Sequence, residues 1–171
     1  MEKLMRMLSP ALIAAAVLCA CSAGQGWAQP APLVFAVAEI HYVDTSGEAV
    51  DQTADHRRRL RDFEAALRGD LAASGKISNA ALDCPPNACS VGDLNDSQLV
   101  AKAKEAGATH LLIGRFHKMS TLIQQAKFDV IDVRARKLVF DRFITFRGDN
   151  DAAWRHAETF LVRQILERGE W

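Results

Sequence analysis

The chain has 171 residues, of which 49% are apolar and 25% are charged, and its formal net charge is zero. These values are ordinary for a soluble globular protein, and the length suits a single domain. A neutral chain has no overall positive field that would attract nucleic acid, so we expect no nucleic-acid partner.

The N-terminus has the layout of a signal peptide. Lys3 and Arg6 precede an apolar run at residues 11–20, which is too short to span a bilayer. Removal of residues 1–28 takes two of the 21 basic and one of the 21 acidic side chains with it, so the mature domain stays near neutral. No later stretch is apolar for long enough to cross a membrane, and we therefore expect an exported protein.

Two cleavage sites fit this segment. A signal peptide of residues 1–28 would end in small residues and leave a short linker at 29–32. Alternatively, Leu18-Cys19-Ala20-Cys21 is similar to a lipobox, which predicts a lipoprotein signal of residues 1–20 and lipidation of Cys21. The protein would then be either soluble in the periplasm or anchored to the outer membrane.

The first half of the mature chain predicts a strand, a loop and a helix. Residues 33–40 form a continuous apolar run, which is typical of a strand covered on both faces, and the polar residues 44–55 predict a loop. A helix is expected from an N-cap at Asp55 to a stop at Ser74-Gly75. Its apolar stripe comprises Leu60, Phe63, Leu67 and Leu71.

A short strand at residues 77–82 is expected to lead into a loop that contains two cysteines. A second helix follows Asp96 and Ser97, with Gly107 as its C-cap. The residues expected to face the core are Leu99, Val100, Ala103 and Ala106.

The last third predicts mostly strands. Residues 109–117 have an apolar centre, while 122–133 and 138–146 alternate as the two arms of a β-hairpin. The turn at 134–137 lacks the Gly or Asn of a tight turn, which indicates a wider loop.

A final helix is expected after the cap at residues 149–151, with Trp154, Ala157, Leu161 and Ile165 directed inward. This order of elements predicts one α/β domain at residues 33–168. We expect a layered fold in which helices pack on a mixed sheet of about five strands with a central β-hairpin.

The stretch DCPPNAC contains Cys84 and Cys89 around two prolines. The CxxxxC spacing differs from the CxxC of thioredoxin-type sites, and no second ligand pair follows at zinc-finger spacing. In an oxidising compartment the simplest interpretation is a disulfide. Metal binding and redox use remain as alternatives.

None of the other motifs indicates a particular reaction. Lys118-Met119-Ser120 is interpreted as a chance match to part of a nucleotide-binding loop, and Arg147-Gly148-Asp149 as a strand end followed by a helix cap. The basic run at residues 56–61 is interpreted as a solvated helical face whose charge is offset by neighbouring acidic residues. No cofactor is expected.

Several stretches together resemble a domain-of-unknown-function family of exported proteobacterial proteins. They are LVFAVAEIHYVDTS, DC…C, AGATHLLIGRFHKMSTLI, FDVIDVRARKLVFDR and RGDNDAAWRHAETFLVR, and the resemblance extends from residue 33 to 166. The chain departs from the family in the longer spacing between its cysteines and in residues 134–137, where the family has Thr-Gly. The order of elements is also similar to the amino-terminal domain of TolB, which implies a layered α/β module for binding or assembly in the cell envelope.

We therefore expect a non-enzymatic module that binds an envelope protein. Its candidate contact surface consists of loop, helix and hairpin residues: Asp83, Pro85, Pro86, Asn87, Arg57, Arg58, Arg134 and Arg136. The alternative hypothesis is a protein that binds a small molecule or metal, or an enzyme, with a pocket near His41, His110 and His117. His110 and His117 have opposite parity on one strand, so no metal site is assigned.

Overall fold

The computed structural model describes residues 33–169 and Trp171. Both alternatives for the signal segment, the lipidation expected at Cys21 and the linker at 29–32 lie outside the described residues. The described chain forms six strands and three helices in the order β1 (Leu33–Val37), β2 (His41–Asp44), α1 (Thr53–Ala73), β3 (Ile77–Ala80), α2 (Asp96–Glu105), β4 (His110–Lys118), β5 (Ile123–Asp132), β6 (Lys137–Arg147) and α3 (Asp151–Arg168).

The strands form one mixed sheet with the order β3-β1-β4-β5-β6, and β2 also pairs with β4. The β1, β2 and β3 pairings are parallel, whereas β4, β5 and β6 run antiparallel to one another. The layered α/β fold expected from the sequence is therefore confirmed, with six strands in place of about five.

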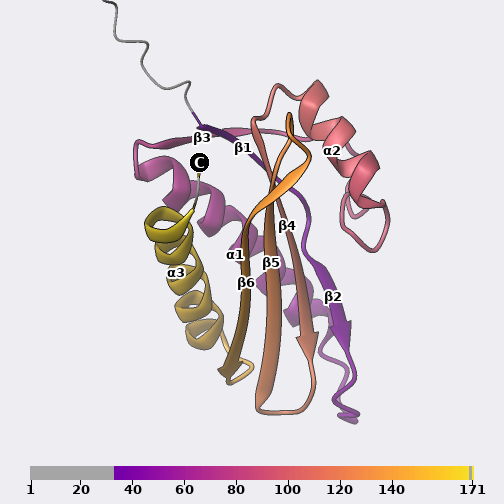
Figure 1. The fold of residues 1–171 in the computed structure, drawn as a ribbon. Coiled ribbons are helices and arrows are strands. Elements are labelled where there is room, and N and C mark those ends of the chain that lie inside the picture. The colour runs from indigo at the N-terminus through magenta and orange to yellow at the C-terminus, as the bar shows by residue number, and fades with distance from the viewer. Residues whose placement is uncertain (1–32, 170) are drawn as a thin grey trace, which may run out of the picture. The chain divides into compact units, whose positions relative to one another are not determined.

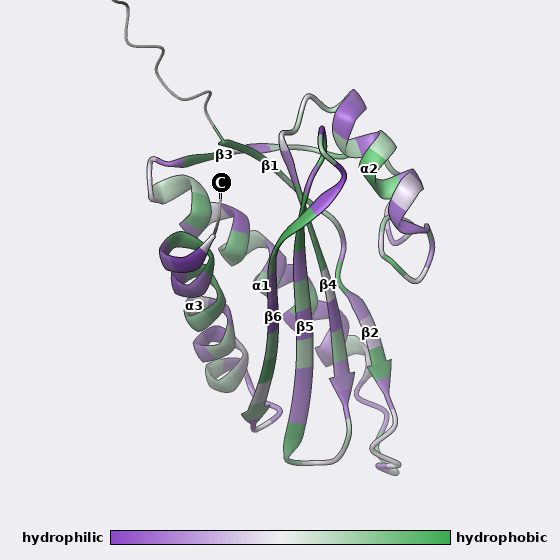
Figure 2. Ribbon diagram, in the orientation of Figure 1, coloured by the Kyte–Doolittle hydropathy of each residue, from purple (hydrophilic) through white to green (hydrophobic). Residues whose placement is uncertain are grey.

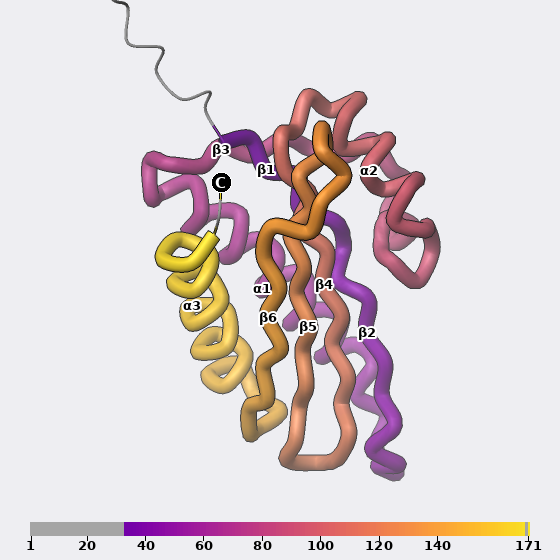
Figure 3. Tube along the Cα trace, in the orientation of Figure 1, coloured from indigo at the N-terminus to yellow at the C-terminus, as the bar shows by residue number. Residues whose placement is uncertain are grey.

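β1 and β2 lie one after the other along the same side of β4 (Figure 3). The strand predicted at residues 33–40 is confirmed only as far as Val37, because the backbone leaves β4 at Glu39. The Glu39 N–H donates to the Cys89 carbonyl, and the Ile40 N–H donates to the Glu64 carboxylate. Pairing with β4 resumes at His41, so strand β2 consists of residues 41–43, for which no element was predicted, and Asp44, the first residue of the expected loop.

The helices cover the two faces of the sheet unequally. Helices α1 and α3 pack on one face, and the shorter α2 covers part of the other (Figure 1). Figure 2 shows hydrophobic residues along β1 and β6, where the strands meet these layers. The larger core cluster joins the predicted stripes of α1 and α3, and the smaller cluster joins α2 to β1 and β4.

Two predicted helix boundaries also shift. Gln52 occupies the N-cap of α1, so Asp55 lies in the first turn and is not the cap. Ala106 is the C-cap of α2, and Gly107 is the following residue with φ of +74°. That left-handed position favours glycine because a side chain would be strained there.

The β5–β6 hairpin has the wider loop that its sequence indicates. The loop lies between Asp132 and Lys137, and the Asp132 carboxylate accepts from the Ala135 N–H at 2.7 Å. Arg136 takes a left-handed φ of +54° where glycine or asparagine would be more usual. None of the described helices is long and apolar enough to cross a membrane.

Candidate functional site

Lys118 is the centre of a buried network of charged side chains. Its side chain is 0% exposed, and its Nζ lies 2.8 Å from a carboxylate oxygen of Asp149 and 2.8 Å from Oε1 of Gln52. It also contacts the carboxylate of Glu48. Burial lowers the pKa of Lys118, but the hydrogen bonds to Asp149 and Glu48 outweigh that effect and raise it above the ordinary value.

Asp149 receives donors from three other side chains. His56 Nε2 lies 2.7 Å from one carboxylate oxygen, while Arg59 Nη1 donates to the other at 3.0 Å and Trp154 Nε1 at 3.3 Å. Burial raises the pKa of Asp149, but the hydrogen bonds from Lys118 and His56 overcome this and hold it below its usual range.

This network ties the end of β4 to the beginnings of α1 and α3. The structural interpretation of Arg147-Gly148-Asp149 agrees with this arrangement, because Asp149 is buried and precedes the Asn150 N-cap of α3. Lys118 has a definite role in the fold, so its interpretation as part of a chance motif was incomplete. Sequence reasoning missed the pairing of Lys118 with Asp149, since the two residues are far apart in the chain.

The interpretation of residues 56–61 as a solvated face was wrong in part. His56 is buried, and the Arg59 Nε lies 2.9 Å from Asp151 at the start of α3. Arg58, a predicted contact residue, also pairs with Asp151 at 2.8 Å. The charge on α1 is therefore offset both by its own Asp55 and Asp62, as expected, and by Asp151 of α3, a partner that local sequence does not reveal.

The cysteine loop is closed by a disulfide between Cys84 and Cys89, whose Cα atoms are 5.7 Å apart. The Glu39 carboxylate accepts from the backbone N–H groups of Asn87 at 2.9 Å and Cys89 at 3.0 Å. Lys102 Nζ donates to the Asp83 carbonyl at 2.7 Å. The loop is thus held at its start, middle and end, while Pro85, Pro86 and Asn87 stay exposed.

The three histidines of the alternative hypothesis do not form a common pocket. His41 pairs with Arg115 in the β2–β4 register, and His110 lies at the opposite end of β4 stacked on Phe35. His117 Nε2 lies 2.7 Å from the Thr45 hydroxyl. No group of three potential metal ligands occurs within residues 33–169.

Two of the predicted contact residues, Arg57 and Asn87, line one groove. We call it the β2 groove: it has a volume of about 220 Å³ and lies between β2, α1 and the cysteine loop. Its other lining residues are Glu39, Ile40, His41, Tyr42, Leu60, Arg61, Glu64, Ser90 and Asp93. The structure therefore brings the cysteine loop and the basic start of α1 to one site.

Arg134 and Arg136 lie elsewhere, in a groove of about 850 Å³ between α2 and the tip of the β5–β6 hairpin. Its lining also includes Val100, Lys104 and Ala108 of the α2 region. The predicted contact residues therefore do not form one surface: Arg57 and Asn87 line the β2 groove, Arg134 and Arg136 line this second groove, and Arg58 lines a pocket between α1 and α3.

Glu158 on α3 is a buried acid that sequence reasoning did not single out. It lines a pocket of about 70 Å³ between α1 and α3, and its Oε1 has no hydrogen-bond partner among the described residues. Burial, with a smaller contribution from Asp70, raises the pKa of Glu158 to about 7.

The fold is a layered α/β domain with a buried charge network and several surface grooves. The chain belongs to a family of proteins of unknown function: the model named DUF3280, described as "Protein of unknown function (DUF2380)", matches residues 34–166. A search of curated proteins finds no match.

Solved structures with a similar arrangement include the hypothetical protein CT253 from Chlamydia trachomatis, at 11% identity and a TM-score of 0.52, which covers 81% of this chain and 95% of that one. TolB from Acinetobacter baumannii is 13% identical with a TM-score of 0.47, covering 80% of this chain and 28% of that one. The LpoB C-terminal domain from Escherichia coli is 12% identical with a TM-score of 0.49, and the match covers 69% of this chain and 83% of that one. The likeness to CT253 concerns the fold alone.

Proposed function

We propose that this protein is an exported, non-enzymatic module that binds a partner protein of the cell envelope. The observation that carries the proposal is the cysteine loop, which is exposed at its tip and fixed at its base. Pro85, Pro86 and Asn87 offer side chains to a partner, while the disulfide and Glu39 hold the backbone in place.

A loop held in this way suits protein recognition. Binding normally costs free energy because flexible groups lose conformational freedom, and a loop that is already ordered avoids much of that cost. Proline further limits the conformations that the backbone can take. Two hydrogen bonds to the Glu39 carboxylate, at 2.9 and 3.0 Å, add charge-assisted contacts at the end of the loop.

The buried network supports a structural role for the charged side chains that form it. Lys118 and His56 both bond to the Asp149 carboxylate inside the domain, and these bonds join β4, α1 and the start of α3. This favours recognition through surface loops and grooves over chemistry at these residues.

The N-terminal segment and the disulfide support the location of this protein in an oxidising compartment. Disulfides persist in exported proteins and are rare in the cytosol. We place the protein in the periplasm, either soluble or anchored through Cys21 to the outer membrane, in contact with an envelope protein whose identity is open.

Affinity capture with a loop variant tests this proposal. The exported form would be immobilised, incubated with envelope extract of its own source, and compared with the variant Pro85→Ala/Pro86→Ala/Asn87→Ala by quantitative mass spectrometry. We expect at least one protein to bind the wild type at least ten times more than the loop variant.

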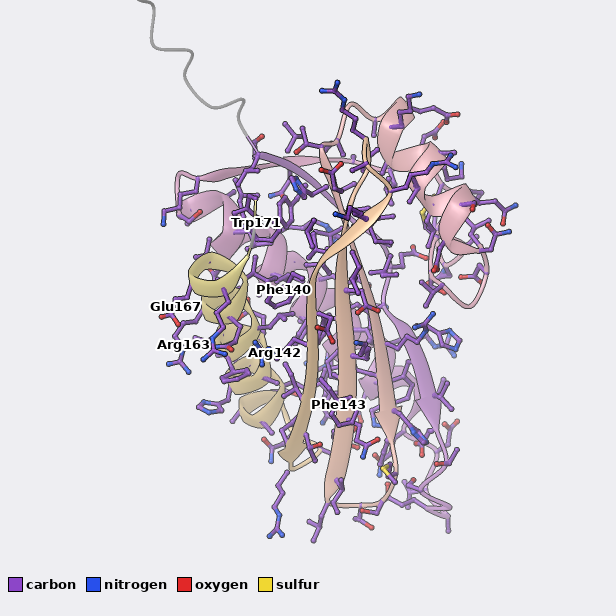
Figure 4. All side chains as sticks on the ribbon, in the orientation of Figure 1. Phe140, Arg142, Phe143, Arg163, Glu167 and Trp171 are labelled. Atoms are coloured by element: carbon purple, nitrogen blue, oxygen red, sulfur yellow. A yellow bond between two sulfur atoms is a disulfide. The ribbon has the colours of Figure 1, made fainter. Side chains whose placement is uncertain are left out.

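The matched control is Arg163→Ala/Glu167→Ala, because both side chains project outward from α3 (Figure 4). It should capture the same protein as the wild type does. If no protein is captured more strongly by the wild type and by this control than by the loop variant, the proposed role of the loop is wrong.

A further inference from the structure

We propose that the outer edge of β2 binds an extended, acidic segment of a partner polypeptide, which adds a strand to the sheet beside β2. This inference rests on the proposed function and specifies the chemistry that the β2 groove would recognise. Its first support is the topology of the sheet at this edge.

The position beside β2 is open. β3 pairs with β1 only as far as Ala36 and Ala80, and a single bridge between Glu39 and Ser90 follows. Beyond that bridge, no described residue pairs with the outer side of β2. The sheet therefore has a vacant strand position of about the length of β2, roughly 13 Å at 3.3 Å per residue.

Backbone groups at this edge are available for pairing. The Thr45 N–H donates to the Lys118 carbonyl on β4, which fixes the direction in which alternate residues point. In a parallel strand the N–H and C=O of one residue point to the same side and those of the next residue to the other. Tyr42 and Asp44 consequently direct their backbone groups to the open edge, as in other sheets that accept an added strand.

The wall of the β2 groove next to this edge is helix α1. Arg57 and Arg61 are one helical turn apart, so they project from the same side of α1. Both are exposed, and neither forms an ion pair within residues 33–169. A chain lying along β2 would have these two guanidinium groups beside it.

The acidic residues of the groove already have donors. Glu39 accepts from the cysteine loop, and Glu64 accepts from the Ile40 N–H at 2.8 Å and from Arg68 at 3.2 Å. Asp93 accepts from the Ser90 hydroxyl at 2.6 Å. The two arginines are thus the charged groups of the groove that remain for a ligand, and carboxylates are their natural partners.

A synthetic peptide tests this assignment directly. The probe is a capped seven-residue peptide of alternating valine and glutamate, and the control peptide has lysine in place of glutamate. Binding to the exported form would be measured by fluorescence anisotropy at 150 mM salt, and amide hydrogen exchange would be followed by NMR with and without peptide.

We expect the acidic peptide to bind, the lysine peptide to bind at least tenfold more weakly, and the amides of Tyr42 and Asp44 to gain protection. Arg57→Glu/Arg61→Glu should weaken binding of the acidic peptide at least tenfold, and Arg155→Glu/Arg163→Glu on α3 should leave it unchanged. Thermal unfolding of each variant would verify that it is folded.

Absence of binding by the acidic peptide, or binding without protection of Tyr42 and Asp44, would overturn the inference. Protection of these amides in the free protein would also overturn it, because a second copy or another part of the chain would then fill the edge. If the peptide fails but the cysteine loop still captures a partner, the proposed function stands without this inference.

Discussion

At the scale of single residues, Lys118 is a fully buried cation that contacts three polar side chains. Its ammonium group is stabilised by the carboxylates of Asp149 and Glu48 and by the Gln52 amide oxygen, and it in turn offsets the charge of the two carboxylates. Removal of one partner from a buried ion pair leaves the other charge uncompensated, which costs more than the pair itself contributes.

Replacement of Lys118 by methionine should therefore lower the free energy of unfolding by about 3–5 kcal/mol. Urea denaturation at pH 7 measures the change. The control is Lys127→Met, because the Lys127 side chain is 37% exposed and pairs with the exposed Asp141 as well as with Asp129, which is 15% exposed. The control should cost less than about 1 kcal/mol, and equal losses in the two variants would contradict the assigned role of Lys118.

Glu158 predicts a specific dependence of stability on pH. Its pKa is raised to about 7 in the folded state from 4.5. The folded protein therefore holds a proton that the unfolded chain releases, and stability is lost as pH rises from about 4.5 to about 7. Replacement by glutamine removes the charge and should stabilise the fold at pH 8 by about 1–3 kcal/mol, with little effect at pH 4.

Urea denaturation at pH 4 and pH 8 would measure this difference. Glu167→Gln is the matched control, since Glu167 is exposed on the same helix. Its substitution should leave stability nearly unchanged at both pH values. If Glu158→Gln raised the free energy of unfolding no more at pH 8 than at pH 4, Glu158 would not be a buried charge in solution.

At the scale of elements, the helices and the hairpin were predictable because their patterns are long. The stripe Trp154, Ala157, Leu161 and Ile165 is buried as its 3.6-residue period indicates. β2 was not predictable: it has four residues, two of which are exposed, and only its pairing with β4 makes it a strand. The charge network was hidden for a similar reason, since contacts distant in sequence leave no local pattern.

The sequence predicted a disulfide-closed loop at Cys84 and Cys89, and the structure contains this disulfide. Substitution and thiol titration test it in solution. Substitution of both Cys84 and Cys89 by serine should lower the free energy of unfolding by about 2 kcal/mol, because so short a closed loop restricts the unfolded chain only modestly. Thiol titration of the denatured, unreduced wild type should find neither cysteine free. Two reactive thiols from this pair would contradict the disulfide.

At the scale of the whole molecule, the end of β4 and the β2 edge differ in their surroundings. The end of β4 is joined to α1 and α3 by buried charges, while the β2 edge is open and adjoins the cysteine loop. The sequence suggested the loop and Arg57 as separate contact residues. Their convergence in one groove follows from the parallel β1–β4 and β2–β4 pairing, which sequence patterns alone do not specify.

Site-specific photo-crosslinking in intact cells tests the central claim most directly. A photoreactive amino acid would replace Arg57 or Asn87 at the β2 groove, or Arg163 or Glu167 on α3 as controls. Our account predicts the same crosslinked envelope protein from both groove positions and none from the controls. Equal crosslinking from all four positions, or none from the groove, would contradict the assignment of this surface to partner binding.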